Sequence, residues 1–288
     1  MSELKLAVVT GANSGVGKAT TLELVRAGWG VVMVCRSEER GGRAMMEILG
    51  ELPRAKLQVE WCDLGVLDEV RALAERLDGW LAAQRLELTA LVNNAGVYRA
   101  RLERTRDGFE RTMAINHLGH FHLTLLLQQR LRRPGARVVN VSSEAHRRSR
   151  VGGRNWERVL RGTGRWNGAK AYCDSKLANI LFTQELHRRW GPEGTVATAV
   201  HPGMLSTAIW DRNRTFGMKV ARLLKPLMGP PEAGGKRVAR VVADLPASEV
   251  KGAYFSREKR VTPGTREDGG FSALCLWEAS EQAVTESF

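Results

Sequence analysis

Short apolar runs alternate with helical stretches along nearly the whole chain, and this alternation restricts the possible folds more than any other feature. Seven runs have the length and composition of strands; they are Leu6–Thr10, Val31–Cys35, Leu57–Trp61, Ala90–Asn93, Arg137–Ser142, Thr195–Val200 and Ala253–Ser256. Most are apolar at successive positions, which is typical of parallel strands covered on both faces. The sequence therefore predicts an α/β fold, a single doubly wound domain over residues 1–288 with a seven-stranded parallel sheet and helices on both faces.

The segments between these runs carry apolar residues at helical spacing. The first predicted helix ends near Ala27, and the others are Glu38–Leu49, Leu67–Trp80, Phe109–Arg132, Ala169–Leu186, Pro231–Leu245 and Ser272–Val284. We expect a break near Gly119 in the fourth helix.

A glycine-rich turn, Thr10-Gly-Ala-Asn-Ser-Gly-Val-Gly17, joins the first strand to the first helix. Glycine allows a tight turn and the close approach of a pyrophosphate, which the free N–H groups and the dipole of a helix N-terminus attract. The context therefore predicts a dinucleotide site of the Rossmann type. Its residues are Gly11, Asn13, Ser14, Gly15, Val16 and Gly17. The alternative is a simple glycine-rich turn, because the spacing is G-x-x-x-G-x-G rather than G-x-G-x-x-G.

The end of the second strand decides between the two nicotinamide cofactors. An acidic residue near this position usually binds the ribose 2′-hydroxyl of NAD, but here the strand ends in Cys35-Arg36. The guanidinium of Arg36 can bind a 2′-phosphate through charge-assisted hydrogen bonds, with help from Arg40. We therefore predict NADP(H), on the expectation that Glu38 and Glu39 lie in the next helix. The alternative is a solvated arginine.

Tyr172 and Lys176 are four residues apart in a predicted helix, so they lie on one helix face. A nearby ammonium favours the phenolate and lowers the pKa of the tyrosine from its usual value near 10. Tyr172 is therefore a candidate general acid and base. The alternative is a surface tyrosine beside a solvated lysine, because such pairs are common in helices.

Further motifs follow in a fixed order: Asn93-Asn-Ala-Gly96, Asn116, Val141-Ser-Ser143, Tyr172-x-x-x-Lys176 and Pro202-Gly203. Together with the glycine turn they resemble the short-chain dehydrogenase/reductase family. Three longer stretches are similar to its retinol dehydrogenase-like branch; they are Asn116-His-Leu-Gly-His-Phe121, Ala171-Tyr-Cys-x-Ser-Lys-Leu-Ala-Asn179 and Leu276-Trp-Glu-Ala-Ser280. The resemblance covers nearly the whole chain.

The resemblance implies a role for each matching residue. Tyr172 would protonate a carbonyl oxygen, and Ser143 would hydrogen-bond that oxygen as charge develops on it. Lys176 would hold the nicotinamide ribose and depress the pKa of Tyr172, and Asn116 would hold a water between Lys176 and solvent. The other implied cofactor contacts are Asp63, Leu64, Asn93, Ala95, Gly96, Pro202, Gly203 and Thr207. The alternatives are a side chain bonded to its own backbone for Asn116 and a helix cap for Asp63.

The implied activity is that of an NADP(H)-dependent oxidoreductase, which interconverts a carbonyl and an alcohol on a small hydrophobic aldehyde, ketone or retinoid-like substrate. Residues 209–230 are rich in apolar side chains and would form the substrate lid. Ordinary core packing is the alternative for this segment. The alternative for the whole chain is a non-catalytic NADP(H)-binding sensor on the same fold.

Residues 144–168 form an insertion between Ser143 and Tyr172, which we expect to be a loop near the mouth of the site. It holds an arginine cluster; the members are Arg147, Arg148, Arg150, Arg154, Arg158, Arg161 and Arg165. The cluster is interpreted either as a grip on an anionic substrate or lipid headgroups, or as a solvated loop.

The net charge of +13 raises the question of a nucleic-acid partner, but the basic residues are spread along the chain without interleaved aromatics, so none is predicted. Four scattered cysteines indicate reduced thiols. There is no apolar anchor or room for a signal peptide, so we expect a cytoplasmic protein. His117, His120 and His122 have poor spacing for a metal, and no metal is assigned. The resemblance implies a homodimer or homotetramer that pairs through residues 109–132 and 170–190.

Overall fold

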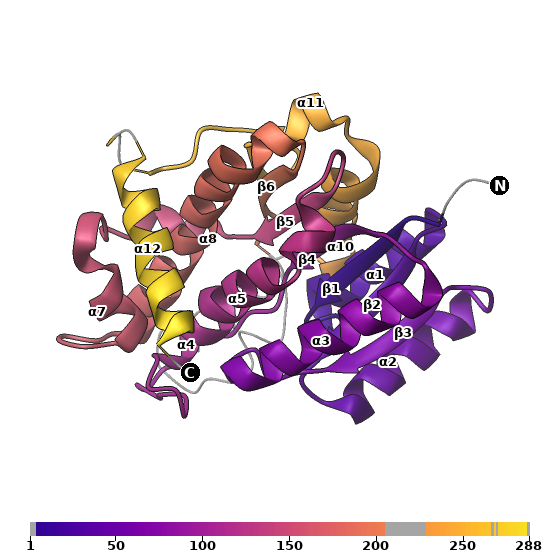
Figure 1. Cartoon of the computed structure of the whole chain (residues 1–288), viewed down its shortest axis with the longest axis horizontal. Helices are drawn as coiled ribbons and strands as arrows, with labels where there is room; N and C mark the ends of the chain where they lie inside the picture. Colours follow the sequence, from indigo (N-terminus) through magenta and orange to yellow (C-terminus); the bar gives the residue numbers. More distant parts are fainter. Residues whose placement is uncertain (1–3, 205–228, 266–267, 269, 287–288) are drawn as a thin grey trace.

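An eight-stranded sheet organises the computed structural model of this chain, which describes residues 4–204, 229–265, 268 and 270–286. The strands are β1 (Leu6–Thr10), β2 (Gly30–Cys35), β3 (Leu57–Trp61), β4 (Leu88–Asn93), β5 (Arg137–Val141), β6 (Val196–His201), β7 (Tyr254–Ser256) and β8 (Lys259–Arg260). Their order is β3-β2-β1-β4-β5-β6-β7-β8 (Figure 1). The parallel, doubly wound arrangement of β1 to β7 is confirmed.

The expected number of seven strands is one too low, because β8 adds an antiparallel strand beside β7. Both residues of β8 are exposed. The strand follows a tight turn at Arg257, whose φ is +58°. A two-residue exposed strand has no apolar pattern, so the sequence carries no periodic signal for it.

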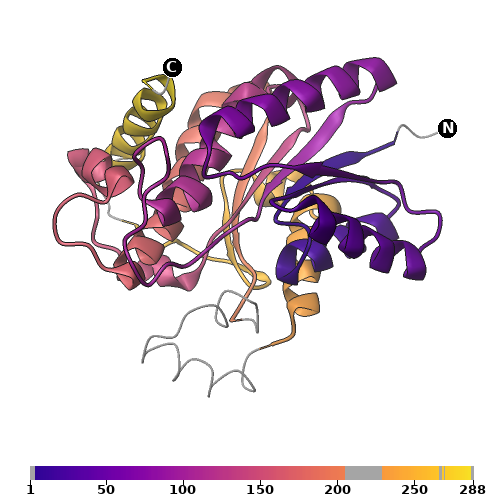
Figure 2. The ribbon, with the colours of Figure 1, turned by 90° about the horizontal axis from the view of Figure 1, so that it is seen from below.

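Helices cover both faces of the sheet, as expected (Figure 2). On one face lie α1 (Gly15–Arg26), α2 (Glu38–Glu51) and α10 (Pro231–Ala239); on the other lie α3 (Leu67–Gln84), α5 (Gly119–Leu126) and α8 (Gly168–Trp190). Successive strand side chains point to opposite faces. Leu6 and Val8 therefore belong to the core under α3, α5 and α8, whereas Ala7 and Val9 belong to the core under α1, α2 and α10.

The predicted break at Gly119 is wrong, because the helix is continuous through this glycine. A short α4 (Arg111–Met113) leads into a π-helical turn η1 (Ala114–Leu118), and α5 and α6 (Gln128–Leu131) follow. Gly119 is required by a close approach instead: a Cβ there would lie 2.2 Å from the carbonyl oxygen of Leu64.

The insertion between β5 and α8 is not simply a loop. It contains the 3₁₀ turns η2 (Glu144–Arg148) and η3 (Gly153–Asn155) and the short helix α7 (Trp156–Arg161). Trp156 is fully buried and anchors the segment in the core under α3, α5 and α8. Burial of such a large side chain ties the segment to the core.

The C-terminal helix α12 (Phe271–Thr285) packs outside α5 and α8 (Figure 1). As a result, residues 112–124 and 173–183 are buried without exception within one chain. These stretches are the faces through which we expected two chains to pair. Because α12 packs against α8 and α5, part of these helices is covered within one chain, and pairing of two chains through these segments stays a prediction.

The remaining short elements are η4 (Gly191–Glu193), η6 (Arg240–Asp244) and α11 (Ala247–Val250). Among the described residues, none of the helices combines the length and apolar character needed to cross a bilayer.

Candidate active site

The glycine turn forms a backbone cradle at the start of α1. Gly11 has a φ of +65°, and a Cβ on Gly17 would lie 2.3 Å from the Gly11 carbonyl oxygen. Ser14 is the N-cap residue, but its side chain makes no capping hydrogen bond, and the first turn of α1 contains no acidic residue. The N–H groups of this turn are therefore open to an anion. The arrangement fits a pyrophosphate, with Asn13 in the turn and Val16 in the first turn of α1.

Arg36, which we predicted to bind a 2′-phosphate, lies at the end of β2. Arg36 is exposed directly after β2, and within the described part of the chain its guanidinium has no acidic partner. Glu38 and Glu39 lie in the first turn of α2, as expected, and Glu39 forms an ion pair with Arg43. The Gly11 N–H donates to the Val34 carbonyl at 2.8 Å, so the turn and the β2 tip are joined.

Thr10 connects the glycine turn to the segment after β4. Its hydroxyl accepts hydrogen bonds from the backbone N–H groups of Asn94 at 2.9 Å and Ala95 at 3.0 Å, and it lies 2.8 Å from His120 Nε2. The Asn94 side-chain amide donates to the Thr10 carbonyl at 2.7 Å. We assigned no role to Thr10, Asn94 or His120 from the sequence, although all three lie inside quoted motifs.

The two polar side chains expected on the adenosine side have other partners. The Asn93 amide donates to Asn140 Oδ1 at 2.8 Å and Thr124 Oγ1 at 3.2 Å, and the residue is 1% exposed, so its side chain lies in the core. The Asp63 carboxylate accepts from the Gly65 N–H at 2.9 Å and pairs with Arg111 at 3.2 Å. It does not cap α3, whose N-cap is a valine. Leu64 is buried.

Tyr172, Ser143 and Lys176 come together where α8 passes the carboxyl end of β5. The Ser143 side chain hydrogen-bonds Tyr172. The Lys176 ammonium lies 5.6 Å from the centre of the Tyr172 ring and donates to the Val141 carbonyl at 3.2 Å. The neighbouring Ser142 faces the other way, because its hydroxyl donates to the Lys176 carbonyl at 2.7 Å.

Asn116 sits in the π turn beside this group. Its Oδ1 accepts from the Val97 N–H at 2.8 Å, and its Nδ2 donates to the Val97 carbonyl at 3.0 Å and to Ser175 Oγ at 3.0 Å. A Cβ on Gly96 would lie 3.5 Å from Lys176 Nζ and 3.6 Å from Asn116 Oδ1. The loop after β4 is therefore close to both side chains, and Asn116 is bonded to this loop rather than to its own helix.

The pKa of Tyr172 differs from our expectation. Burial raises it to about 12, and the hydrogen bond with Ser143 only partly offsets this effect. The nearby ammonium does not lower it as predicted, because Lys176 lies over the ring and is itself affected by burial, which lowers its pKa to about 8.

The turn that holds Ser143 is fixed to the C-terminal segment. His146 Nδ1 donates to the Ser143 carbonyl at 2.7 Å, and His146 Nε2 accepts from the Gly264 N–H at 3.0 Å, so the ring is neutral. The Tyr254 hydroxyl donates to Glu144 Oε1 at 3.0 Å. No sequence pattern indicated the contacts with Gly264 and Tyr254, which join segments more than a hundred residues apart.

At the end of β6, Gly203 has a φ of +112°, and the Pro202 carbonyl accepts from Arg237 at 2.8 Å. Thr207 and nearly all of the expected lid, residues 209–228, lie outside the described residues. Three histidines have a spacing that suits a metal poorly, and all three are buried; they are His117, His120 and His122.

Comparison with known proteins gives consistent results. The short chain dehydrogenase family matches residues 5–155. Retinol dehydrogenase 12 of Mus musculus is 38% identical over 96% of this chain and 85% of that protein. A crystal structure of an uncharacterised protein from Mycobacterium paratuberculosis is 32% identical, with a TM-score of 0.74 over 98% of this chain and 94% of that one. A blue fluorescent protein from a metagenomic library, solved in complex with NADPH, is 27% identical, with a TM-score of 0.67 over 94% and 98%.

Proposed function

Since the chain belongs to the short chain dehydrogenase family of oxidoreductases, we propose that it interconverts a carbonyl and an alcohol with NADP(H). The observation that carries this proposal is the Ser143–Tyr172 hydrogen bond, with Lys176 and Asn116 beside it. A hydroxyl pair of this kind can hold one substrate oxygen and exchange a proton with it.

The cofactor would occupy the surface between α1 and the β2 tip. The open N–H groups at Gly15 and its neighbours would hold the pyrophosphate, and Arg36 would bind the 2′-phosphate. The NADPH in the 27% identical relative supports this choice. When bound, the nicotinamide supplies or accepts the hydride.

The chain's own residues would handle the proton. In the direction of reduction, the Tyr172 hydroxyl gives its proton to the substrate oxygen while Ser143 donates a hydrogen bond to the same oxygen. The Lys176 ammonium stabilises the phenolate that remains, although only at a distance in the structure described. Because burial raises the pKa of Tyr172 to about 12, the protonated form that reduction requires dominates at neutral pH.

We further propose a hydrophobic substrate of the retinoid type. The support is the retinol dehydrogenase name of the 38% identical relative. A panel of retinaldehyde and unbranched aliphatic aldehydes, each followed by NADPH absorbance, would test this proposal.

The decisive experiment is the Tyr172→Phe substitution. We expect kcat to fall by roughly 10²–10⁴ while NADPH affinity is retained, because only the proton donor is lost. Ser143→Ala and Ser142→Ala form a matched pair of adjacent serines. The former should lower kcat strongly, whereas the latter should affect mainly stability, because the Ser142 hydroxyl bonds the Lys176 carbonyl. If the wild-type chain binds NADPH but turns over no carbonyl in the panel, it is a non-catalytic binding protein.

Cofactor choice is tested by Arg36→Glu. Loss of a charge-assisted hydrogen bond and gain of a repulsive carboxylate should raise the KM for NADPH about 10- to 100-fold and leave that for NADH unchanged or lower. Arg43→Glu is the matched control, since it makes the same charge change at another exposed arginine, in the following helix α2. A wild-type preference for NADH would contradict the role given to Arg36.

A further inference from the structure

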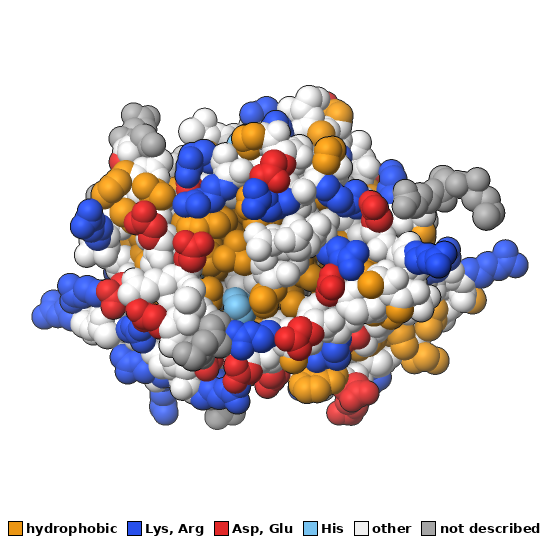
Figure 3. All heavy atoms as spheres, in the orientation of Figure 1, with side chains coloured by type: hydrophobic (Ala, Val, Ile, Leu, Met, Phe, Trp, Pro, Cys, Tyr) orange, Lys and Arg blue, Asp and Glu red, His pale blue; other side chains and the backbone are white. Residues whose placement is uncertain are grey.

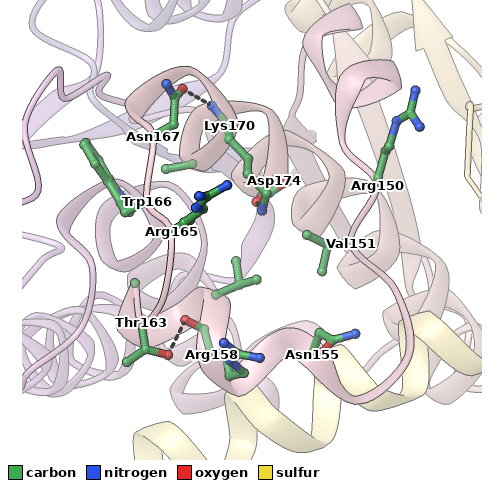
Figure 4. Close-up of a pocket in the computed structure, with 13 residues that line it drawn as sticks. Arg150, Val151, Asn155, Arg158, Thr163, Arg165, Trp166, Asn167, Lys170 and Asp174 are labelled. Atoms are coloured by element: carbon green, nitrogen blue, oxygen red, sulfur yellow. Dashed lines mark hydrogen bonds and ion pairs between the residues drawn. The ribbon is translucent and has the colours of Figure 1, made fainter.

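A pocket of about 310 Å³ lies between the insertion and the first turns of α8 (Figure 4). Its walls come from residues 150–174 and include none of the candidate catalytic side chains. Consecutive residues of an α-helix are rotated by about 100°. Ala171 and Asp174, which line the pocket, are therefore on the side of α8 opposite to Tyr172 and Lys176. The pocket is a separate site.

The pocket has a strong excess of positive charge. Its cationic side chains are Arg150, Arg158, Arg165 and Lys170, and its single acidic side chain is Asp174. The Asp174 charge is already compensated, because its carboxylate accepts from Lys170 Nζ at 2.6 Å and from Ser149 Oγ at 2.6 Å.

Two guanidinium groups have no such compensation. In the part of the chain that the structure describes, neither Arg158 nor Arg165 forms an ion pair. Arg161, one turn along from Arg158, pairs with both Glu157 and Glu286, so acidic partners are available nearby on other surfaces. Figure 4 shows Arg165 reaching toward α8, and Arg158 on the α7 side of the pocket.

The N-terminus of α8 adds to the positive charge of the pocket. The helix is 23 residues long and begins at Gly168, so the positive end of its dipole lies beside Arg165 and Lys170. Asn167 caps only one N–H, that of Lys170, at 3.1 Å. The remaining first-turn N–H groups add to the field at this wall.

Part of the wall is apolar. Val151, Val159, Ala171 and Trp166 contribute to it, and Val151 is only 8% exposed. A fully solvated inorganic anion would gain nothing from this surface, whereas an anion with an apolar group would bury area on it.

We propose that this pocket binds a small amphiphilic phosphate monoester, with its phosphate between Arg158 and Arg165 and its apolar group against Val151, Val159 and Trp166. Two uncompensated guanidinium groups match the two negative charges of a phosphate monoester at neutral pH. The same headgroup chemistry occurs in a free metabolite and at a membrane surface that contains phosphatidic acid.

The test is calorimetric titration of the full chain with dodecyl phosphate, in the presence of saturating NADP⁺ so that the cofactor cradle is filled. Arg158→Gln/Arg165→Gln should weaken binding at least about tenfold. The matched control is Arg26→Gln/Arg43→Gln, which removes the same charge from exposed positions on α1 and α2 and should change the affinity less than about twofold. Thermal unfolding of both double variants verifies that they fold.

Three outcomes would overturn the proposal: no binding by the wild-type chain, equal weakening in both double variants, or equal affinity for inorganic phosphate and dodecyl phosphate. The source of the ligand is resolved with phosphatidylcholine vesicles that do or do not contain phosphatidic acid. Binding to the acidic vesicles that is lost in Arg158→Gln/Arg165→Gln supports a lipid headgroup. Binding of dodecyl phosphate alone supports a free metabolite.

Discussion

Truncation of Trp277 to alanine should lower the free energy of unfolding by about 3 kcal/mol, because this side chain fixes α12 to the rest of the chain. Trp277 is 4% exposed. Its ring centre lies 5.1 Å from that of Phe121 and 6.0 Å from that of Phe182. The guanidinium of Arg189, on α8, lies 4.4 Å from the centre of the Trp277 ring.

The magnitude follows from three contributions. Trp→Ala substitutions in a core cost about 3–5 kcal/mol, and loss of the cation–π contact with Arg189 adds about 0.5–1 kcal/mol. Against these, the Trp277 Nε1–H is buried and has no hydrogen-bond partner among the described residues, so its removal relieves a desolvation cost of about 1–3 kcal/mol. The packing contribution is the largest, and a net loss of about 3 kcal/mol remains.

Urea unfolding followed by far-UV circular dichroism measures this loss, and it should correspond to a fall in Tm of roughly 6–12 °C. Trp61→Ala is the matched control, because Trp61 is 49% exposed on the edge strand β3 and should cost less than about 1 kcal/mol. Size-exclusion chromatography adds a second readout: Trp277→Ala should form larger species than the wild-type chain as α12 loosens from α5 and α8. Equal losses for the two tryptophans would refute the packing assigned to α12.

Two further predictions concern α5 and its surroundings. Burial lowers the pKa of His120 to about 4, below the unfolded value near 6.5. Between these two pH values the unfolded chain binds more protons than the folded chain. The free energy of unfolding must therefore fall as the pH falls from about 6.5 to about 4. At pH 5 the loss should be about 2 kcal/mol for this residue; His120→Gln should reduce the difference between urea midpoints at pH 7 and pH 5, and an unchanged difference would contradict the assignment. Gly119→Ala should destabilise the fold by about 1–3 kcal/mol, because its Cβ would meet the Leu64 carbonyl. Gly79→Ala in α3, where the added Cβ meets nothing within 4 Å, should instead stabilise by up to about 1 kcal/mol, and similar urea midpoints for the two glycine variants would be inconsistent with the close approach at Gly119.

The parts of the fold that rest on periodicity could be predicted from the sequence. Runs such as Ala7-Val-Val9 are apolar at every position, and the structure shows a hydrophobic core on each face of the sheet. The glycine turn could be placed because its backbone conformation is dictated by local residues, as the positive φ of Gly11 and Gly15 shows.

The parts of the fold and site that depend on contacts between residues distant in sequence could not be predicted. The Asn93 side chain bonds Asn140 and the Asp63 side chain pairs with Arg111, each more than forty residues away, and no local pattern reports these partners; the cofactor contacts of both residues stay predictions. The same limit applies to the pKa of Tyr172: spacing showed the lysine one turn along, whereas burial, which no local pattern reports, decides the direction of the shift.

The distribution of charged side chains over the surface also could not be predicted from the sequence. Figure 3 shows lysine and arginine side chains spread over this face of the molecule and interspersed with aspartate and glutamate, rather than gathered into one basic surface. Most described arginines outside the pocket beside α8 have an acidic neighbour; examples are Arg76, Arg130 and Arg188. A high net charge therefore does not by itself indicate a nucleic-acid partner in this chain.

The π turn at Ala114–Leu118 allows one helix to meet two requirements: its apolar side faces the core, and Asn116 faces Val97. A turn of this type takes up one residue more than an α-helical turn, while the axis continues in the same direction. Shortening this turn by one residue would restore a regular helix whose apolar side could still face the core, but Asn116 would be rotated by about a quarter of a revolution away from Val97. A chain altered in this way could fold well and yet lose the hydrogen bonds by which Asn116 joins the loop after β4 to α8.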